Sequence, residues 1–315
     1  MGILTIVLIL SLLFGCASFP PPTLTVENDA TLNVLATTNI VGDVVARVGG
    51  DKIRLTVLLP TGSDPHSFEA SPQDLAQAAE ADLVFANGAG LEQFLDDMIE
   101  SAGAGDRVVH VSEGIDLLGQ EKQAESTGET HESENRHVYK GGDPHVWTDP
   151  NNVKVWVRNI ESALSKADPE NAGLYTSNAD AYQSELEKLD AWIRSRVAAI
   201  PPEKRLIVTD HALLGYFAEQ YGFRQVGAIV PAYSSLAEPT AQELARIEDS
   251  IASLDVRAVF VGKTVNPALA ERLSHDTGVQ LVFFYTGSLS EPSSEAGTYL
   301  DYMRYNTRAI VDALR

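Results

Sequence analysis

The sequence has a single cysteine, Cys16, among its 315 residues. One cysteine excludes a disulfide framework within the chain, a four-cysteine zinc site and a Cys-x-x-Cys redox pair. Basic residues are few as well, since 23 Lys and Arg stand against 44 Asp and Glu and give a formal net charge of −21. Binding to nucleic acid depends on a concentrated basic surface, so we expect no nucleic-acid partner. Whatever chemistry this protein has must therefore use nitrogen and oxygen ligands.

The start of the chain lacks an apolar run long enough to cross a bilayer. The run Ile3–Phe14 is well short of the roughly 20 residues that a transmembrane helix needs. It is typical of a signal peptide, which we place at residues 1–15. Cys16 follows directly in LFGCAS, which resembles a bacterial lipobox, so we predict that Cys16 carries a lipid and that residues 16–30 are a tether. The protein would then be extracytoplasmic, anchored to the cell membrane or periplasmic; the alternative is that Cys16 is an ordinary apolar residue of a cleaved segment.

Strand and helix patterns alternate in two blocks, one before residue 112 and one after Pro201. The expected buried strands are LNVLATT, KIRLTVLLP, DLVFANG and RVVHV in the first block, and RLIVTDH, QVGAI, RAVFVG and VQLVFFY in the second. The expected helices are PQDLAQAAEA, LEQFLDDMIESA, and residues 213–220, 241–253 and 267–277. This alternation predicts an α/β fold with two lobes, each a largely parallel sheet flanked by helices. Ligands of such sheets gather at the carboxyl ends of the strands.

Between the two blocks, apolar residues recur at the spacing of three and four that marks one face of a helix. They are Tyr175, Ala179, Tyr182, Leu186, Leu189, Ile193, Val197 and Ile200. We predict one rigid linking helix over residues 168–200, about 45 Å long at 1.5 Å per residue, that runs across both lobes. The N-terminal lobe then spans residues 31–167 and the C-terminal lobe residues 201–315. The alternative is a helix that packs on one lobe alone.

One segment of the N-terminal lobe departs from this rhythm. Residues 119–142 contain almost no apolar side chains but include His131 and His137. We expect a mobile polar loop, either a solvated insertion or a segment that helps to collect cations.

Three of the seven histidines share a sequence context. They are His66 in PTGSDPHSFE, His145 in GGDPHVWTDP and His211 in IVTDHALLGYF. Each lies where a strand or loop should bring its side chain to the cleft between the two predicted lobes. Each also has an aspartate one or two positions earlier that could fix the imidazole tautomer: Asp64, Asp143 and Asp210. Imidazole is the commonest metal ligand, and Zn²⁺ accepts three nitrogens with a fourth position for water or carboxylate. The pattern predicts a metal site between the lobes; the alternative is three separate surface or capping residues.

Several motifs occur in an order that resembles one protein family. They are GSDPHSFEASPQDL, FANGAGLEQFL, DPHVWTDPNN, VTDHALLGYFAEQYG, AEPTAQEL and GTYLDYMRYN, together with the predicted linking helix. Over nearly all of its mature length, the chain resembles the metal-binding solute-binding lipoproteins of zinc and manganese ABC transporters.

The resemblance implies that His66 and His145 of the first lobe and His211 of the second bind the metal. Manganese members often have Glu where this chain has His211, so the resemblance favours Zn²⁺, with Mn²⁺ as the alternative. The family often supplies a fourth ligand as Asp in a segment like YTDSL, but this chain reads YTGSL, with Gly287 at that place. The fourth position is thus left to water, to Glu291 or to a group of the polar loop.

These observations predict a protein that captures Zn²⁺ outside the cytoplasm and delivers it to the membrane permease of an ABC transporter. We expect a monomer and not an enzyme. A manganese- or iron-binding member of the same family is the nearest alternative. A zinc-dependent hydrolase is a further one, but the sequence has neither HExxH nor GxSxG. The last alternative is a surface adhesin.

Overall fold

The computed structural model describes residues 31–92, 98–99, 101, 103–119 and 142–315. The predicted signal peptide, the tether with Cys16 and most of the polar loop, including His131 and His137, lie outside these residues. So does most of the helix expected at residues 91–102.

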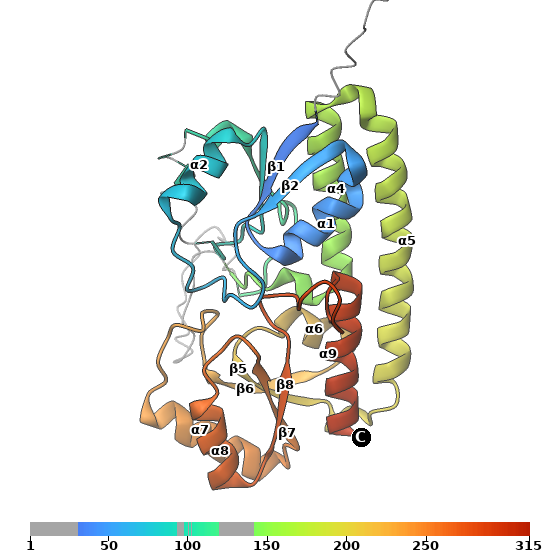
Figure 1. Ribbon diagram of the computed structural model, residues 1–315. Coiled ribbons are helices and arrows are strands. Elements are labelled where there is room, and N and C mark those ends of the chain that lie inside the picture. The colour runs from blue at the N-terminus through green and yellow to red at the C-terminus, as the bar shows by residue number, and fades with distance from the viewer. Residues whose placement is uncertain (1–30, 93–97, 100, 102, 120–141) are drawn as a thin grey trace, which may run out of the picture. The chain divides into compact units, whose positions relative to one another are not determined.

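The first sheet consists of four parallel strands in the order β2-β1-β3-β4. The strands are β1 (Leu32–Ala36), β2 (Ile53–Val57), β3 (Leu83–Ala86) and β4 (Val108–His110). All four coincide with expected strands. The flanking helices are α1 (Asn39–Gly49) and α2 (Pro72–Glu80), which follow β1 and β2 (Figure 1). Ser71 and Asp74 form a capping box that fixes the start of α2.

The second sheet repeats this topology in the order β6-β5-β7-β8, again with parallel strands. Its strands are β5 (Leu206–His211), β6 (Arg224–Val230), β7 (Ala258–Gly262) and β8 (Gln280–Phe284), and its helices are α6 (Gly215–Tyr221), α7 (Ala241–Leu254) and α8 (Ala268–Thr277). Every residue of β7 is buried, as expected for a parallel strand covered on both faces. The prediction of two α/β lobes is confirmed.

The linking helix is α5 (Ala172–Val197), preceded by a short 3₁₀ turn at Pro169–Asn171. Its 26 residues span about 39 Å. It packs against α1 and α4 (Pro150–Ala167) and also against α9 (Tyr299–Leu314), so it contacts helices from both ends of the chain (Figure 1). The alternative of a helix packed on one lobe alone is therefore wrong. The expected apolar face is the buried face.

One hydrophobic cluster joins the helices around α5 to both sheets. It contains Val41 of α1, Trp156 of α4, Leu186 of α5, Phe260 of β7 and Tyr302 of α9, all buried. Residues 31–315 form one compact unit, and the lobe limits at 167 and 201 stay predictions. Among the helices of the described residues, none has the length and apolar character needed to cross a membrane.

Candidate metal centre

His66, His145 and His211 converge, although they are far apart in the sequence. Each offers one ring nitrogen, and these three nitrogens all lie within 4.8 Å of one another. Nε2 of His66 and Nε2 of His145 are 3.2 Å apart. The ring of His211 stands 5.6 Å from that of His66 and 5.1 Å from that of His145, measured between ring centres. The structure thus brings together the three histidines that the sequence singled out.

The topology explains this convergence. His211 is the last residue of β5, and His66 lies in the segment that follows β2. His145 comes just before the 3₁₀ turn at Val146–Thr148 that leads into α4. Parallel strands present their carboxyl ends at one edge of each sheet, where loops can carry ligands. His145 and His211 are 2% and 3% exposed, whereas His66 is only half-buried and forms the outer side of the cluster.

Two of the three expected aspartates hold the imidazoles. Nδ1 of His145 lies 2.8 Å from Oδ1 of Asp143, and Nδ1 of His211 lies 2.7 Å from Oδ1 of Asp210. A proton on Nδ1 that is donated to the carboxylate leaves the lone pair of Nε2 free for a metal ion. Both rings are therefore oriented as ligands.

Asp64 does not play this role, which corrects the expectation from the repeated DPH. Its Oδ1 accepts the backbone N–H of His66 at 3.0 Å, and its Oδ2 accepts a short hydrogen bond from the hydroxyl of Ser235. Oδ1 of Asp143 and Oδ1 of Asp210 each accept both the backbone N–H and the ring N–H of their histidine, whereas Oδ1 of Asp64 accepts the backbone N–H alone. The aspartate fixes the backbone of the turn and not the ring.

Several positioning residues could not be identified from the sequence. The backbone N–H of Gly262 donates to Oδ2 of Asp210 at 2.6 Å, and the hydroxyl of Tyr216 donates to the carbonyl of Asp143 at 2.7 Å. Nδ2 of Asn87 donates to the carbonyl of Pro144 at 3.1 Å. Asn87 itself is held by the buried Glu92, which accepts its backbone N–H. The FANGAGLEQFL motif was the only signal for this last pair.

The cluster fits a small tetrahedral cation. Zn²⁺ binds imidazole nitrogen at about 2.0 to 2.1 Å, so two nitrogens of a tetrahedral site are roughly 3.3 to 3.4 Å apart. The 3.2 Å between the Nε2 atoms of His66 and His145 is close to this value. Without a cation, one of these two nitrogens must carry a proton, since two lone pairs would repel each other. A metal ion takes the place of that proton.

The fourth position receives no protein group from the residues named for it. Gly287 has no side chain, and the side chain of Glu291 is exposed and is not part of the histidine group. Among the described residues, the candidate metal group consists of the three histidines alone. Water at the fourth position stays a prediction.

Burial disfavours the protonated form of two of the three histidines, His66 and His145. It is the main cause that lowers the pKa of His66 to about 3, and the neighbouring His145 and His211 lower it further. Burial also lowers the pKa of His145 well below its usual value. In the same environment, burial raises the pKa of Asp143, and the hydrogen bond from the backbone N–H of His145 opposes this rise. At neutral pH the imidazoles of His66 and His145 are therefore neutral, which is the form that binds metal.

The lowered pKa of His66 predicts an acid sensitivity of the metal-free fold. Between about pH 6.5 and 3, the unfolded chain binds a proton at His66 that the folded chain does not. The free energy of unfolding therefore falls as the pH falls. From pH 7 to pH 5, His66 should lower the free energy of unfolding by at most about 2 kcal/mol, at roughly 1.4 kcal/mol per pKa unit. Urea unfolding in the presence of a chelator should show a steeper loss for wild type than for His66→Asn.

His275→Asn serves as the control for this comparison, because its side chain is 87% exposed. It should leave the pH dependence of unfolding as in wild type. If the free energy of unfolding changed equally with pH in wild type and in His66→Asn, the lowered pKa of His66 would be contradicted.

The other two histidines of the described residues lie outside the cluster. His110 ends β4 and is exposed, and His275 lies on α8 with its Nδ1 3.0 Å from Asp276. They are not part of the metal group.

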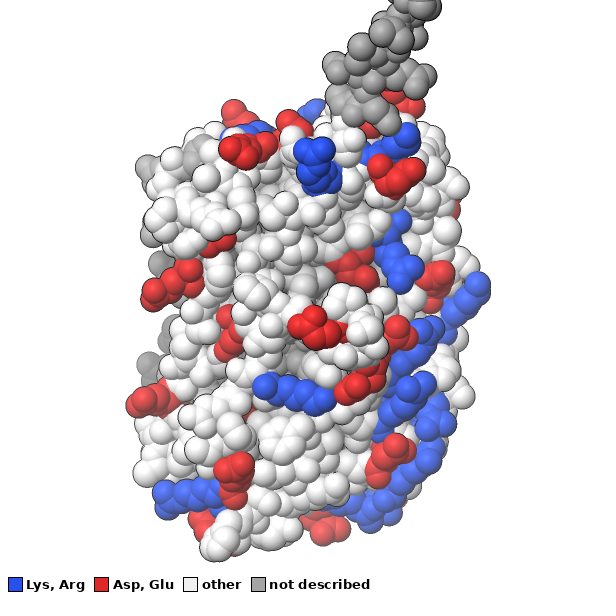
Figure 2. All heavy atoms as spheres, viewed as in Figure 1, with Lys and Arg blue, Asp and Glu red and all other residues white. Residues whose placement is uncertain are grey.

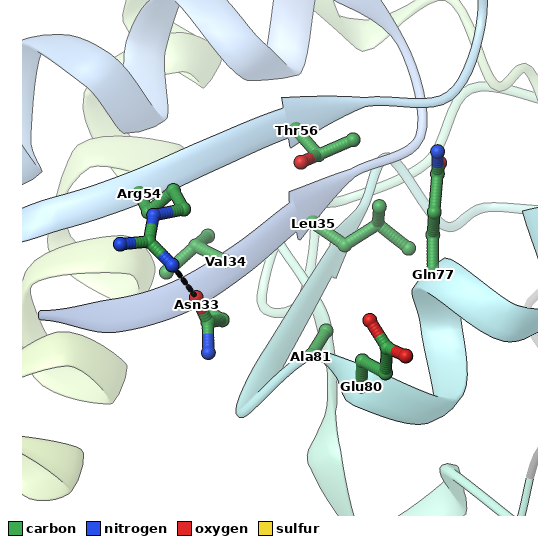
Figure 3. A pocket seen from close by; sticks show the side chains of 8 residues that line it. All are labelled: Asn33, Val34, Leu35, Arg54, Thr56, Gln77, Glu80 and Ala81. Atoms are coloured by element: carbon green, nitrogen blue, oxygen red, sulfur yellow. Dashed lines mark hydrogen bonds between the residues drawn. The ribbon is translucent and has the colours of Figure 1, made fainter.

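A hollow of about 240 Å³ lies beside strands β1 and β2 of the first sheet (Figure 3). Its lining comes from the early parts of β1 and β2 and from α2 and its end: Asn33, Val34, Leu35, Arg54, Thr56, Gln77, Glu80 and Ala81. Nη1 of Arg54 donates to Oδ1 of Asn33 at 3.3 Å. This hollow contains none of the three histidines. A second hollow, of about 390 Å³, includes Asp64 and Ser235 and so reaches the turn of His66.

The surface of the protein carries charges of both signs. Figure 2 shows acidic and basic side chains interspersed on one face, with basic ones gathered along the side where α5 and α9 lie. Because the net charge of the chain is −21, these basic side chains do not make the protein as a whole basic.

Comparisons with known proteins agree with this geometry. The sequence model of the family described as zinc-uptake complex component A, periplasmic (ZnuA), matches residues 34–313. The manganese-binding lipoprotein MntA of Halalkalibacterium halodurans is 35% identical over 301 residues, which are 95% of this chain and 93% of that protein. The manganese ABC transporter substrate-binding lipoprotein PsaA of Streptococcus pneumoniae is 30% identical over 310 residues, 96% of this chain and 94% of that protein.

Solved structures show the same fold. The periplasmic zinc-binding protein TroA of Treponema pallidum has a TM-score of 0.79 at 26% identity, covering 90% of this chain and 99% of that one. A Mn-bound periplasmic metal-binding protein of Candidatus Liberibacter asiaticus has a TM-score of 0.76 at 26% identity, covering 90% and 100%. The chain therefore belongs to the ZnuA family, the extracytoplasmic metal-binding components of ABC transporters.

Proposed function

We propose that this protein captures Zn²⁺ and delivers it to the permease of its transporter. The observation that supports zinc is the donor set, three imidazole nitrogens without a carboxylate among them. Zn²⁺ accepts such a set readily, whereas Mn²⁺ prefers carboxylate, carbonyl and water oxygens. The two aspartates that hold His145 and His211 strengthen the imidazoles as ligands but do not join the group.

The family consists of substrate-binding proteins and not of enzymes, which removes the hydrolase alternative. Relatives of this chain are lipoproteins. By this likeness we propose a lipid anchor on Cys16 that keeps a monomeric protein at the membrane beside its permease. The adhesin alternative leaves the convergence of three imidazoles without a purpose.

Manganese is the second candidate, because the relatives MntA and PsaA are named for manganese. The ligands of those proteins are not given by their names. A manganese site in this chain would need oxygen donors from water to complete a larger coordination shell.

Competitive titration together with elemental analysis tests the metal. We expect one Zn²⁺ per chain, bound at least roughly 100-fold more tightly than Mn²⁺, and zinc in the protein isolated from its own cell envelope. Nitrogen sites favour Zn²⁺ over Mn²⁺ in general, so the ratio needs a reference. The variant His211→Glu supplies this reference, because a carboxylate ligand at residue 211 should bring the affinities for Zn²⁺ and Mn²⁺ closer together. Manganese in the isolated protein, or equal affinities in wild type, would refute the zinc proposal.

A further inference from the structure

Gly287 lies in direct contact with the turn that carries His66. A Cβ atom built on Gly287 would stand 2.5 Å from Cδ and 2.8 Å from Cγ of Pro65. Contacts under 3.0 Å do not persist, so any side chain at residue 287 forces a neighbour to move. Pro65 is buried and its ring is stiff. It also immediately precedes His66, so a shift of Pro65 is passed on to the ligand.

The loop that contains Gly287 cannot easily give way instead, because hydrogen bonds hold it on both sides. Before Gly287, the carbonyl of Thr286 accepts the indole N–H of Trp147 at 3.3 Å and the hydroxyl of Tyr302 at 2.8 Å. After it, the hydroxyl of Ser288 accepts the backbone N–H of Gly62 and Nδ2 of Asn39, each at 2.8 Å.

These hydrogen bonds also connect the two lobes. Leu289 donates its backbone N–H to Oδ1 of Asn39 at 2.9 Å. Asn39 begins α1 in the first lobe, while Thr286 and Leu289 follow β8 in the second. Retreat of the loop would break several of these bonds, at about 1 kcal/mol or more for each polar group left unpaired.

We infer that Gly287 is a positioning residue, which lets Pro65 approach the loop after β8 and so sets the place of His66 in the metal group. This inference rests on the proposed capture of Zn²⁺ and specifies how the second lobe shapes a ligand of the first. It also explains why the loop contributes no ligand, since the space beside Gly287 is filled by the ring of Pro65.

A double-mutant cycle between residues 287 and 65 tests the inference. The variants are Gly287→Ala, Pro65→Ala and both together, each titrated with Zn²⁺ in the purified full chain. We expect Gly287→Ala to weaken zinc binding by roughly tenfold or more, in the range seen when a ligand loses its support. Pro65→Ala removes the atoms that the new methyl group meets, so the double variant should bind within about threefold of Pro65→Ala alone.

Gly173→Ala is the matched control, because a Cβ at that residue meets nothing within 4 Å. It should bind zinc like wild type. The unfolding midpoint of each metal-free variant shows whether the fold is intact, and the rescue by Pro65→Ala separates positioning from general damage. Zinc binding by Gly287→Ala equal to wild type, or no rescue in the double variant, overturns the inference. Failure of wild type to bind zinc would instead refute the proposed function.

Discussion

His145→Ala should abolish the stabilisation that zinc gives to the wild-type protein. The substitution removes one of three nitrogens and leaves two, with the carboxylate of Asp143 deprived of its imidazole partner. Affinity should fall by more than the roughly 100-fold that is the upper range for losing an outer partner of a ligand. At a zinc concentration 100 times the dissociation constant, wild type gains about 2.7 kcal/mol in unfolding free energy, and the variant should gain almost none.

For each variant, the free energy of unfolding with zinc is compared with its value in the presence of a chelator. This comparison is needed because the loss of a buried side chain also changes the stability of the metal-free fold. His66→Ala and His211→Ala should behave like His145→Ala. His275→Ala removes an exposed histidine that is not part of the metal group, and this variant should keep the full stabilisation by zinc. Zinc stabilisation that survives in all three cluster variants would show that the metal binds elsewhere.

The sequence predicted the linking helix well because its evidence was local. The apolar residues of α5, from Tyr175 to Val197, repeat every three or four positions and form the buried face. The same spacing occurs in α4, where Val153, Trp156 and Ile160 are buried. The motif DPHVWTDPNN covers only the first residues of this helix, and the rest of the helix was not predicted. α9 overlaps the motif GTYLDYMRYN but was likewise not predicted as a helix. These two omissions were errors of interpretation and not a lack of signal.

The identical motifs around His66 and His145 show what a local pattern cannot provide. Both read DPH, yet only Asp143 reaches its imidazole, while Asp64 bonds to Ser235, which is 171 residues away. The partner of Asp64 thus comes from the other lobe and has no signal in the local motif. Gly287 and Gly262 are similar cases, because the atoms that make a glycine necessary belong to distant segments. The candidate ligands and two of their supports, Asp143 and Asp210, could be named from the sequence, but the other supports came only from tertiary contacts.

Asp210→Asn should weaken zinc binding by about 10- to 100-fold, the usual cost of losing the carboxylate behind a histidine ligand. Oδ1 of Asp210 accepts both the backbone N–H and the ring N–H of His211, and Oδ2 accepts the backbone N–H of Gly262. An amide offers one oxygen in place of two, so its NH₂ group must face a donor. Where it faces the ring, the proton of His211 moves to Nε2 and blocks the metal. Isothermal titration with Zn²⁺ measures the loss.

Asp64→Asn is the matched control for this prediction, because the same chemical change meets different partners. An asparagine at residue 64 can keep its oxygen on the backbone N–H of His66 and turn its NH₂ toward Ser235, whose hydroxyl can accept as well as donate. Its zinc affinity should therefore stay within about threefold of wild type, since no imidazole tautomer depends on this carboxylate. Equal losses for Asp64→Asn and Asp210→Asn would mean that the negative charge near the site, and not the orientation of the rings, governs zinc binding.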